Sequence, residues 1–397
     1  MIQELRRAVR AYRDEMAQFT GELIAIPTEN PPGRFYERCL RRIADQLEAL
    51  GFSSRVEPVP DGDIEAENRR FWLRSDWGQG DRAVYFHGHV DVVPAFDPSQ
   101  FVPQLSEETI FGRGSTDMKG GLVSMIYAMK ALASCGVELA GRIALRIVPD
   151  EETGGELGSR TLRRAGRLFD DDAVAMLTAE PTGGVVWNAS RGAITCRVHT
   201  TGRTAHVGHA YRGVNAFEKA VAVADALRVL KNDVASRKTA YPIEPEAARH
   251  SILMMGGEVQ GGANFNVVPE RFSFTVDRRI NPEEDYAREK ERLLDVIETN
   301  GGTVELIQEA RAAAVSSTHP AARALGQAIE EVRGEAAPFE LCPGLLEIRF
   351  YAENGIPAFA YGPGLLSVAH GPNEFVKRRD IEECALVYAL FATRLLS

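Results

Sequence analysis

The chain has 397 residues, 44% of them hydrophobic and 26% charged, which indicates a folded globular protein and excludes a collagen-like fibre, a disordered tail or a disulfide-stapled miniprotein. Its 46 Lys and Arg against 56 Asp and Glu give a net charge of −10, and an acidic chain without a basic run does not predict nucleic-acid binding. The five scattered cysteines form no CxxC pair, which argues against a cysteine zinc site and for a reducing compartment. Neither a signal peptide nor an apolar run of membrane-spanning length is present, so we expect a soluble, cytoplasmic protein that does not enter a membrane.

The N-terminal part predicts helices followed by an α/β domain. Apolar residues recur at helical spacing from Ile2 to Leu23, which predicts a helix that ends before Pro27, and a second helix is expected at about 37–50. Short apolar runs then alternate with helices, one of which carries an apolar stripe from Leu122 to Leu132. The clearest predicted strands are 83–86, 143–148, 174–178 and 358–361. Strands separated by helices favour a mostly parallel sheet with helices on both faces.

The middle of the chain has a different pattern. Residues 193–202 and 271–280 alternate apolar and polar side chains, as half-buried antiparallel strands do. Helices are expected at about 215–230 and 283–299, and a helix near 320–332 returns to the α/β style. We therefore predict a discontinuous domain interrupted by an α+β insert, with boundaries 1–185, 186–304 and 305–397.

Clusters of acidic residues, histidines and glycines follow several of the predicted strands. Loops at the carboxyl ends of strands are where open α/β sheets form their sites. The clusters are HGHVDVVP (87–94), GRGSTDMKGG (112–121), PDEETGGE (149–156), TAEPT (178–182) and GPGLLSVAHGPNE (362–374).

The residue types in these clusters are those of a metal site. His89 and Asp91 are two residues apart, so Asp91 can accept a hydrogen bond from the imidazole nitrogen of His89 that does not bind the metal. Asp117 lies among glycines, where the backbone can approach an ion closely. Glu151 and Glu152 are adjacent carboxylates, of which one can bind a metal while the other transfers a proton.

The candidate ligands comprise two imidazoles and three carboxylates, namely His89, Asp117, Glu152, Glu180 and His370. Nitrogen and oxygen ligands suit zinc, with cobalt or manganese as alternatives. Five ligands are too many for one tetrahedral zinc, but they suit two divalent ions that share a bridging carboxylate. The competing motifs HExxH, GxxxxGK[ST] and GxSxG and an EF-hand loop are absent from the sequence.

The series HxDVVP, GRGxxDMKGG, DEE, AEPT and GPG…AHxxNE resembles the two-metal metallopeptidase and deacylase family of acetylornithine deacetylase, succinyl-diaminopimelate desuccinylase and glutamate carboxypeptidase. The resemblance runs from about Ile24 to Val387 in the family's order and spacing. It implies a zinc-peptidase-like catalytic domain with an inserted lid and dimerisation domain. It also implies that His89 and Glu180 bind one metal, that Glu152 and His370 bind the other, and that Asp117 bridges them. Asp91 would orient His89, and Glu151 would be the general base.

The insert carries further residues that the resemblance marks. The stretch GRTAHVGHAYRGVNAFEKA is similar to the family's lid and dimerisation segment, which implies a homodimer in which His206 reaches the active site of the partner subunit. Asn266 and Arg279 lie in a stretch similar to the lid strand and would face the substrate's carboxylate. Arg191 and Arg349 are further candidates for substrate binding. The residues around His206 and the segment Leu346–Arg349, which stands where the family often has T-D-x-R, depart from the family pattern.

The sequence thus predicts a metal-dependent amidohydrolase for a small N-acyl amino acid or a related carboxylate-bearing substrate. A dipeptidase or aminopeptidase with the same site is the nearest alternative. A non-catalytic metal-binding dimer is the alternative from another class, and the presence of Glu151 beside Glu152 argues against it, because a binding protein has no need of a base. His87 is expected to be structural.

Overall fold

The computed structural model describes residues 1–60 and 69–397, and its contacts divide the chain into two compact units. Unit 1 comprises residues 1–188, 315–339 and 350–397, and unit 2 comprises residues 189–314 and 340–349. The domain boundaries expected from the sequence stay a prediction. Across the described ranges, none of the helices combines the length and the apolar character that crossing a bilayer requires.

The largest sheet is parallel at its centre. Its strands run in the order β1-β2-β6-β3-β7-β15-β8-β13, with β14 paired to β8, and the path leaves unit 1 within β8. β3 pairs in parallel with β6 and β7, and β7 pairs in parallel with β15, whereas the outer pairs are antiparallel. The strands are β1 Arg55–Pro58, β2 Phe71–Gly78, β3 Ala83–His89, β6 Arg142–Val148, β7 Ala173–Thr178, β8 Val186–Ser190, β13 Ala313–Ala314, β14 Phe339–Cys342 and β15 Ala358–Ala360. A small sheet holds β4 Gln104–Leu105, β5 Thr109–Phe111 and β16 Phe375–Lys377.

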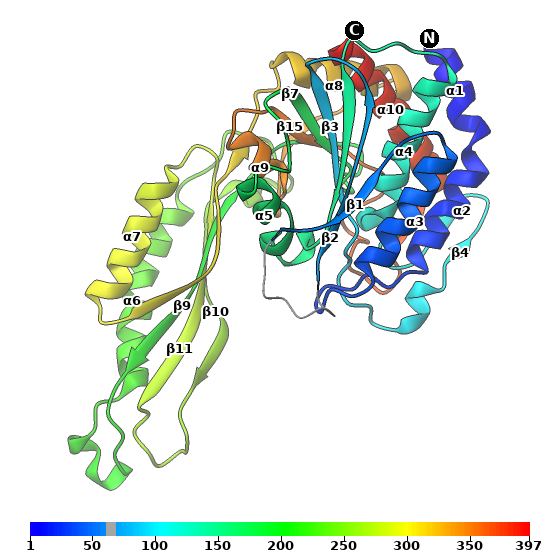
Figure 1. Ribbon diagram of the computed structural model, residues 1–397. Coiled ribbons are helices and arrows are strands. Elements are labelled where there is room, and N and C mark those ends of the chain that lie inside the picture. The colour runs from blue at the N-terminus through cyan, green and yellow to red at the C-terminus, as the bar shows by residue number, and fades with distance from the viewer. Residues whose placement is uncertain (61–68) are drawn as a thin grey trace. The chain divides into compact units, whose positions relative to one another are not determined.

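Helices cover both faces of this sheet in unit 1 (Figure 1). Successive side chains of a strand point to opposite faces. The ring of Phe86 in β3 lies 5.8 Å from that of Tyr388 in α10, and the ring of His87 lies 5.4 Å from that of Tyr351 in α9. The helices that accompany the large sheet are α1 Ile2–Ala11, α2 Arg13–Ile24, α3 Tyr36–Ala49, α4 Gly120–Ser134, α5 Thr161–Arg164, α8 Pro320–Arg333, α9 Ile348–Ala352 and α10 Arg378–Leu396. His87 is buried, and its Nδ1 lies 3.2 Å from the hydroxyl oxygen of Tyr351, which agrees with the structural role expected for it.

Unit 1 differs from the sequence prediction at both ends of the chain. The first predicted helix is two helices, because the chain breaks at Tyr12, whose ring packs against Tyr127. Helix α10 was not predicted at all. Buried residues occupy most sides of it, from Ile381 to Leu396, so it lacks the amphipathic period by which a half-buried helix is recognised.

Unit 2 is a two-layer α+β structure. Its antiparallel sheet has the order β10-β11-β9-β12, and helices α6 and α7 cover one face of it (Figure 1). The elements are β9 Gly192–Thr201, α6 Ala216–Ala235, β10 Ile252–Gly261, β11 Arg271–Ile280, α7 Tyr286–Thr299 and β12 Thr303–Ala310. Ile194 and Val198, at alternate positions of β9, share one buried apolar cluster with Val223 and Leu227 of α6 and Ile297 of α7. The predicted class, an α/β fold with a largely parallel sheet, helices on both faces and an α+β insert, is confirmed.

Candidate metal centre

Three parallel strands place the candidate ligands at one edge of the sheet. The central strand β3 ends at His89. Its neighbour β6 leads into Glu151 and Glu152, and its other neighbour β7 leads into Glu180. Because parallel strands have their carboxyl ends at the same edge, these residues meet although the sequence separates them widely.

Asp91 ties the β3 end to the β6 end. Its carboxylate is fully buried and accepts hydrogen bonds from the backbone amides of Glu151, at 3.2 Å, and Glu152, at 3.0 Å. Nδ1 of His89 lies 3.0 Å from the backbone oxygen of Asp91 and 3.5 Å from its Oδ1. The backbone carbonyl is therefore the nearer partner of His89, and the carboxylate holds the turn that carries the two glutamates.

Asp117 lies in the turn Ser115–Lys119 that precedes α4, and the Asp117–Met118 peptide is cis. The turn packs closely on β3. A Cβ on Gly88 would lie 2.8 Å from Cε of Met118 and 2.5 Å from a Leu122 methyl group, so a larger residue there would force these side chains to shift. The Asp117 side chain is thereby brought beside His89.

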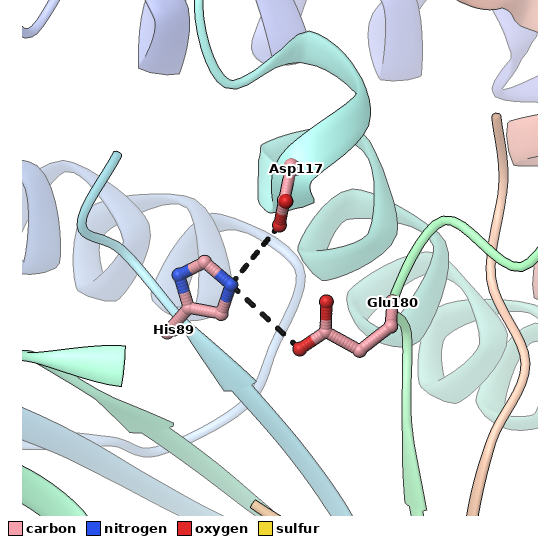
Figure 2. Close-up of side chains that lie close together, drawn as sticks. All are labelled: His89, Asp117 and Glu180. Carbon is pink, nitrogen blue, oxygen red and sulfur yellow. Dashed lines mark ion pairs between the residues drawn. The ribbon is translucent and has the colours of Figure 1, made fainter. Parts of the chain in front are cut away.

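The candidate ligands form two groups that share Asp117. In the first, Nε2 of His89 lies 3.2 Å from Oδ1 of Asp117 and 3.8 Å from Oε1 of Glu180. Figure 2 shows one nitrogen of the His89 ring facing both carboxylates. In the second, Nε2 of His370 lies 3.1 Å from Oδ2 of Asp117 and 3.2 Å from Oε2 of Glu152. Within each group the potential ligand atoms lie within 4.8 Å of one another. The two oxygens of Asp117 thus face different histidines.

The electrostatic potential of this cluster favours cations. Hydrogen bonds to Asp117 and Glu152 raise the pKa of His370 to about 10. Burial alone would lower the pKa of His89, but the neighbouring carboxylates of Asp117 and Asp91 outweigh it and hold that pKa well above its usual value. Burial and the neighbouring Asp117 raise the pKa of Glu152 to about 6. Carboxylates that hold protons on imidazoles this firmly also attract metal ions.

Buried atoms within the cluster fit divalent cations. Nε2 of His89, Oδ1 of Asp117 and Oε1 of Glu152 are buried and have no hydrogen-bond partner in the described part of the chain. Leaving such groups unpaired costs about 1–3 kcal/mol each. Coordination by a metal ion satisfies them, and imidazole nitrogens with carboxylate oxygens are a ligand set that zinc accepts.

Unit 2 holds the other residues that the sequence marked. His206 is exposed at the start of a short turn, where its Nδ1 accepts from the Gly208 amide, and the neighbouring Val207 amide donates to the carbonyl of Asn266. Arg279, on β11, pairs with Asp277 of its own strand at 2.7 Å.

The two remaining arginines are buried. Nε of Arg191 donates to Asn281, and its Nη2 donates to the carbonyls of Ala248 and His250. Nη1 of Arg349 donates to the carbonyl of Leu346. Their guanidinium groups are therefore engaged within unit 2, whereas His206 and Asn266 lie nearer its surface.

Asn30 is a site residue that the sequence did not reveal. It is buried, and its amide nitrogen donates to Asp91, Asp150 and Thr153 at 2.9, 3.2 and 2.9 Å. It therefore joins the N-terminal loop to the turn that carries Glu151. A lone polar residue before two prolines carries no periodic signal, so only its proximity in the fold identifies it.

Comparison with known proteins relates these features to a family. The sequence matches peptidase family M20/M25/M40 over residues 85–394. An N-formyl-4-amino-5-aminomethyl-2-methylpyrimidine deformylase of Halalkalibacterium halodurans is 26% identical over 94% of this chain and 92% of its own length. A probable succinyl-diaminopimelate desuccinylase of Staphylococcus epidermidis is 26% identical over 90% of this chain and 92% of its own length.

The fold agrees with this relationship. The dipeptidase Dug1p of Saccharomyces cerevisiae has a TM-score of 0.77 at 16% identity, and the match covers 99% of this chain and 98% of that chain. At this identity the likeness establishes the fold. Since the family match spans most of the sequence, the chain belongs to peptidase family M20/M25/M40 and is, as its sequence predicts, a metal-dependent hydrolase of amide bonds.

Proposed function

We propose that the protein hydrolyses the amide bond of an N-acyl amino acid or a related small substrate that carries a carboxylate, with Glu151 as the general base. The observation that carries this proposal is the pair of ligand groups joined by Asp117, with Glu151 next to Glu152 in the same turn. The relatives support an acyl-amide substrate, because their names describe removal of a formyl or a succinyl group. The second candidate is a dipeptidase or aminopeptidase, which would use the same site on the fold it shares with Dug1p.

Two divalent ions fit the ligand groups. We assign His89 and Glu180 to one ion, Glu152 and His370 to the other, and Asp117 to both, with zinc expected and cobalt or manganese as alternatives. When bound, the ions polarise the scissile carbonyl and acidify the attacking water.

Glu151 is the residue that moves the proton. The Glu152 side chain is only 5% exposed and faces His370, so it serves as a ligand. Glu151 is half-buried, and the bond from its amide to Asp91 fixes its backbone at the edge of the cluster. As general base it takes a proton from water and later delivers it to the leaving amine.

We further propose that unit 2 serves as the lid and dimerisation domain of a homodimer, in which His206 stabilises the oxyanion in the partner subunit's site. The edge strand β10 and the outer face of α6 support this, because both present exposed apolar side chains. They are Ile252, Met254 and Val259 on the strand and Phe217, Val221 and Val229 on the helix.

The substrate's carboxylate is assigned to residues of unit 2. Arg279 and Asn266 are the accessible candidates, and a guanidinium binds a carboxylate in bidentate fashion. Arg191 and Arg349 remain candidates, but each must exchange internal hydrogen bonds to reach a ligand.

The cysteines favour a cytoplasmic location for this enzyme. All five are free thiols, and Cys39, Cys196, Cys342 and Cys384 are buried. Thiols persist where the compartment is reducing. We therefore place the protein in the cytoplasm.

A substrate panel tests the proposed activity. The zinc-loaded protein is incubated with N-formyl, N-acetyl and N-succinyl amino acids and with dipeptides, and amine release is measured with and without a chelator. We expect turnover of acyl amino acids, and a large loss when the carboxylate of the best substrate is replaced by its methyl ester. Equal turnover of acid and ester would contradict the carboxylate requirement. Faster cleavage of dipeptides than of every acyl amino acid would establish the second candidate.

A further inference from the structure

Two signature segments each contain a charged residue to which the proposed mechanism gives no role. Arg113 lies in GRGSTDMKGG and Glu374 closes AHGPNE. Their side chains are each 1% exposed, and Nη1 of Arg113 lies 2.7 Å from Oε2 of Glu374. Because of desolvation, a buried ion pair is often no more stabilising than a well-packed apolar pair, so the other contacts of these two side chains bear on their role.

Glu374 holds the backbone of the proposed bridging ligand. Its Oε1 accepts hydrogen bonds from the amides of Thr116, at 3.0 Å, and Asp117, at 3.1 Å. Its own carbonyl accepts from the Gly112 amide at 3.0 Å. One carboxylate therefore binds both the turn before α4 and the arginine that precedes it in the chain.

Arg113 binds the backbone of His370, the ligand that faces Asp117 in the second group. Its Nη2 donates to the carbonyl of His370 at 3.2 Å and to that of Pro94 at 3.4 Å. His370 has a φ of 62°, in the left-handed region that non-glycine residues seldom occupy. A residue in that conformation needs support from its surroundings, and the bond to its carbonyl supplies it.

We propose that Arg113 and Glu374 are positioning residues, a buried pair that sets the separation of Asp117 and His370 and thereby the affinity of the second metal ion. Through the pair, the amide of Asp117 is linked to the carbonyl of His370 by charged side chains alone. The two ligand atoms it places, Oδ2 of Asp117 and Nε2 of His370, lie 3.1 Å apart. The proposal rests on the ligand assignment of the proposed function.

The test measures metal binding rather than turnover. Metal-free wild type, Glu374→Gln, Arg113→Lys and the double variant Arg113→Met/Glu374→Gln are titrated with Co²⁺, and both binding steps are followed by calorimetry and by the visible spectrum. The double variant removes both charges at similar size, so it keeps the test open if a single variant does not fold. Arg146→Lys is the matched control, because Arg146 is also buried and paired, with Asp76 at 3.2 Å. His370→Ala identifies the step that depends on the second site.

One of the two binding steps should be lost in His370→Ala. We expect the Co²⁺ affinity of that step to fall by about 10- to 100-fold in all three pair variants, as is typical when partners of metal ligands are removed. The Arg146→Lys control should stay within about threefold of wild type in both steps, and the other step of the pair variants should weaken less than the step that depends on His370. Because the two residues act as one unit, the double variant should lose no more than the worse single variant.

Two results would overturn the proposal. One contradicts only the positioning role, and the other also contradicts the ligand assignment. If His370→Ala loses a binding step but the pair variants keep it, or lose it only as far as Arg146→Lys does, Arg113 and Glu374 have no positioning role. If His370→Ala leaves both steps intact, the ligand assignment is wrong and the positioning proposal fails with it.

Discussion

Three candidate ligands of unit 1 and two candidate residues of unit 2 are held in different ways. In unit 1, the side chains of His89, Asp117 and Glu180 are at most 9% exposed, and charged or backbone partners face them from several directions. In unit 2, His206 is exposed on a turn, and Asn266 lies in a neighbouring loop. The first group is preorganised within one core, whereas the accessibility of His206 is what its proposed role in a partner's site requires.

If the proposed roles hold, metal binding depends on unit 1 alone, whereas turnover depends on both units. All proposed ligands belong to unit 1, so changes in unit 2 should leave metal content untouched. The proposed substrate contacts and His206 belong to unit 2, so turnover should respond to both units. A variant that broke this division would contradict the proposed roles.

The largest expected effect comes from Glu151→Gln. The amide keeps the shape of the side chain but cannot accept a proton, and loss of a general base lowers turnover by about 10²- to 10⁴-fold. Metal content should remain that of the wild type. Glu156→Gln is the control, since Glu156 pairs with Arg160 and Arg164 in the next turn. More than half of the wild-type rate in Glu151→Gln would remove this residue from the mechanism.

Asp117→Ala tests whether metal binding depends on unit 1. One carboxylate faces both histidines, so its loss should reduce bound metal at both positions, as measured by elemental analysis after dialysis. Asp277→Ala, which removes the partner of Arg279 in unit 2, should retain both ions. Two tightly held ions in Asp117→Ala would show that this residue does not bridge them.

That the proposed ligands of unit 1 lie close together could be predicted from the sequence more readily than the contacts of unit 2, for a physical reason. Parallel strands with short apolar runs align their carboxyl ends, so the clusters after β3, β6 and β7 had to meet. No such rule shows that Arg191 is bonded to Asn281 and to backbone carbonyls. Those bonds depend on tertiary packing that leaves no periodic mark.

The same limit applies to whole elements. The regular alternation of β9 and β11 made them predictable, but β10 contains Gly256 and Gly257, and its register shifts between Met255 and Val259. A bulge of this kind interrupts the two-residue period by which strands are recognised. Helix α10 could not be recognised because it is buried on most sides and therefore lacks the polar stripe of an amphipathic helix.

Metal affinity should rise with pH. The pKa of His370 is raised to about 10 by Asp117 and Glu152, so in the metal-free protein this imidazole is protonated between pH 6.5 and 10. A metal must displace that proton, and apparent affinity should therefore increase about tenfold per pH unit across this range. Competition titrations at pH 6.5, 7.5 and 8.5 measure the slope. His199→Gln in unit 2 should not alter it, and a flat profile in the wild type would contradict the assignment of His370.

The smallest expected effect, a factor of about two, tests whether unit 2 serves its own subunit or a partner. His206→Ala and Glu151→Gln subunits are each expected to be inactive or nearly so, and both variants are prepared with full metal content. If His206 acts across a homodimer interface, a mixed dimer has one site with both defects and one site with neither. Subunit exchange should then restore up to about half of the wild-type activity per mixed dimer, in proportion to the mixed dimers formed.

Exchange must be verified independently, for example by mass spectrometry of differently tagged subunits. The control pairs Glu151→Gln with Asp117→Ala: both defects lie in unit 1, so every site of a mixed dimer keeps a defect and no activity should return. Recovery in the first mixture alone would assign the exposed histidine to the neighbouring subunit. No recovery despite complete exchange would place His206 in its own subunit's site or outside catalysis, and the contrast between the two units would then reflect accessibility rather than assembly.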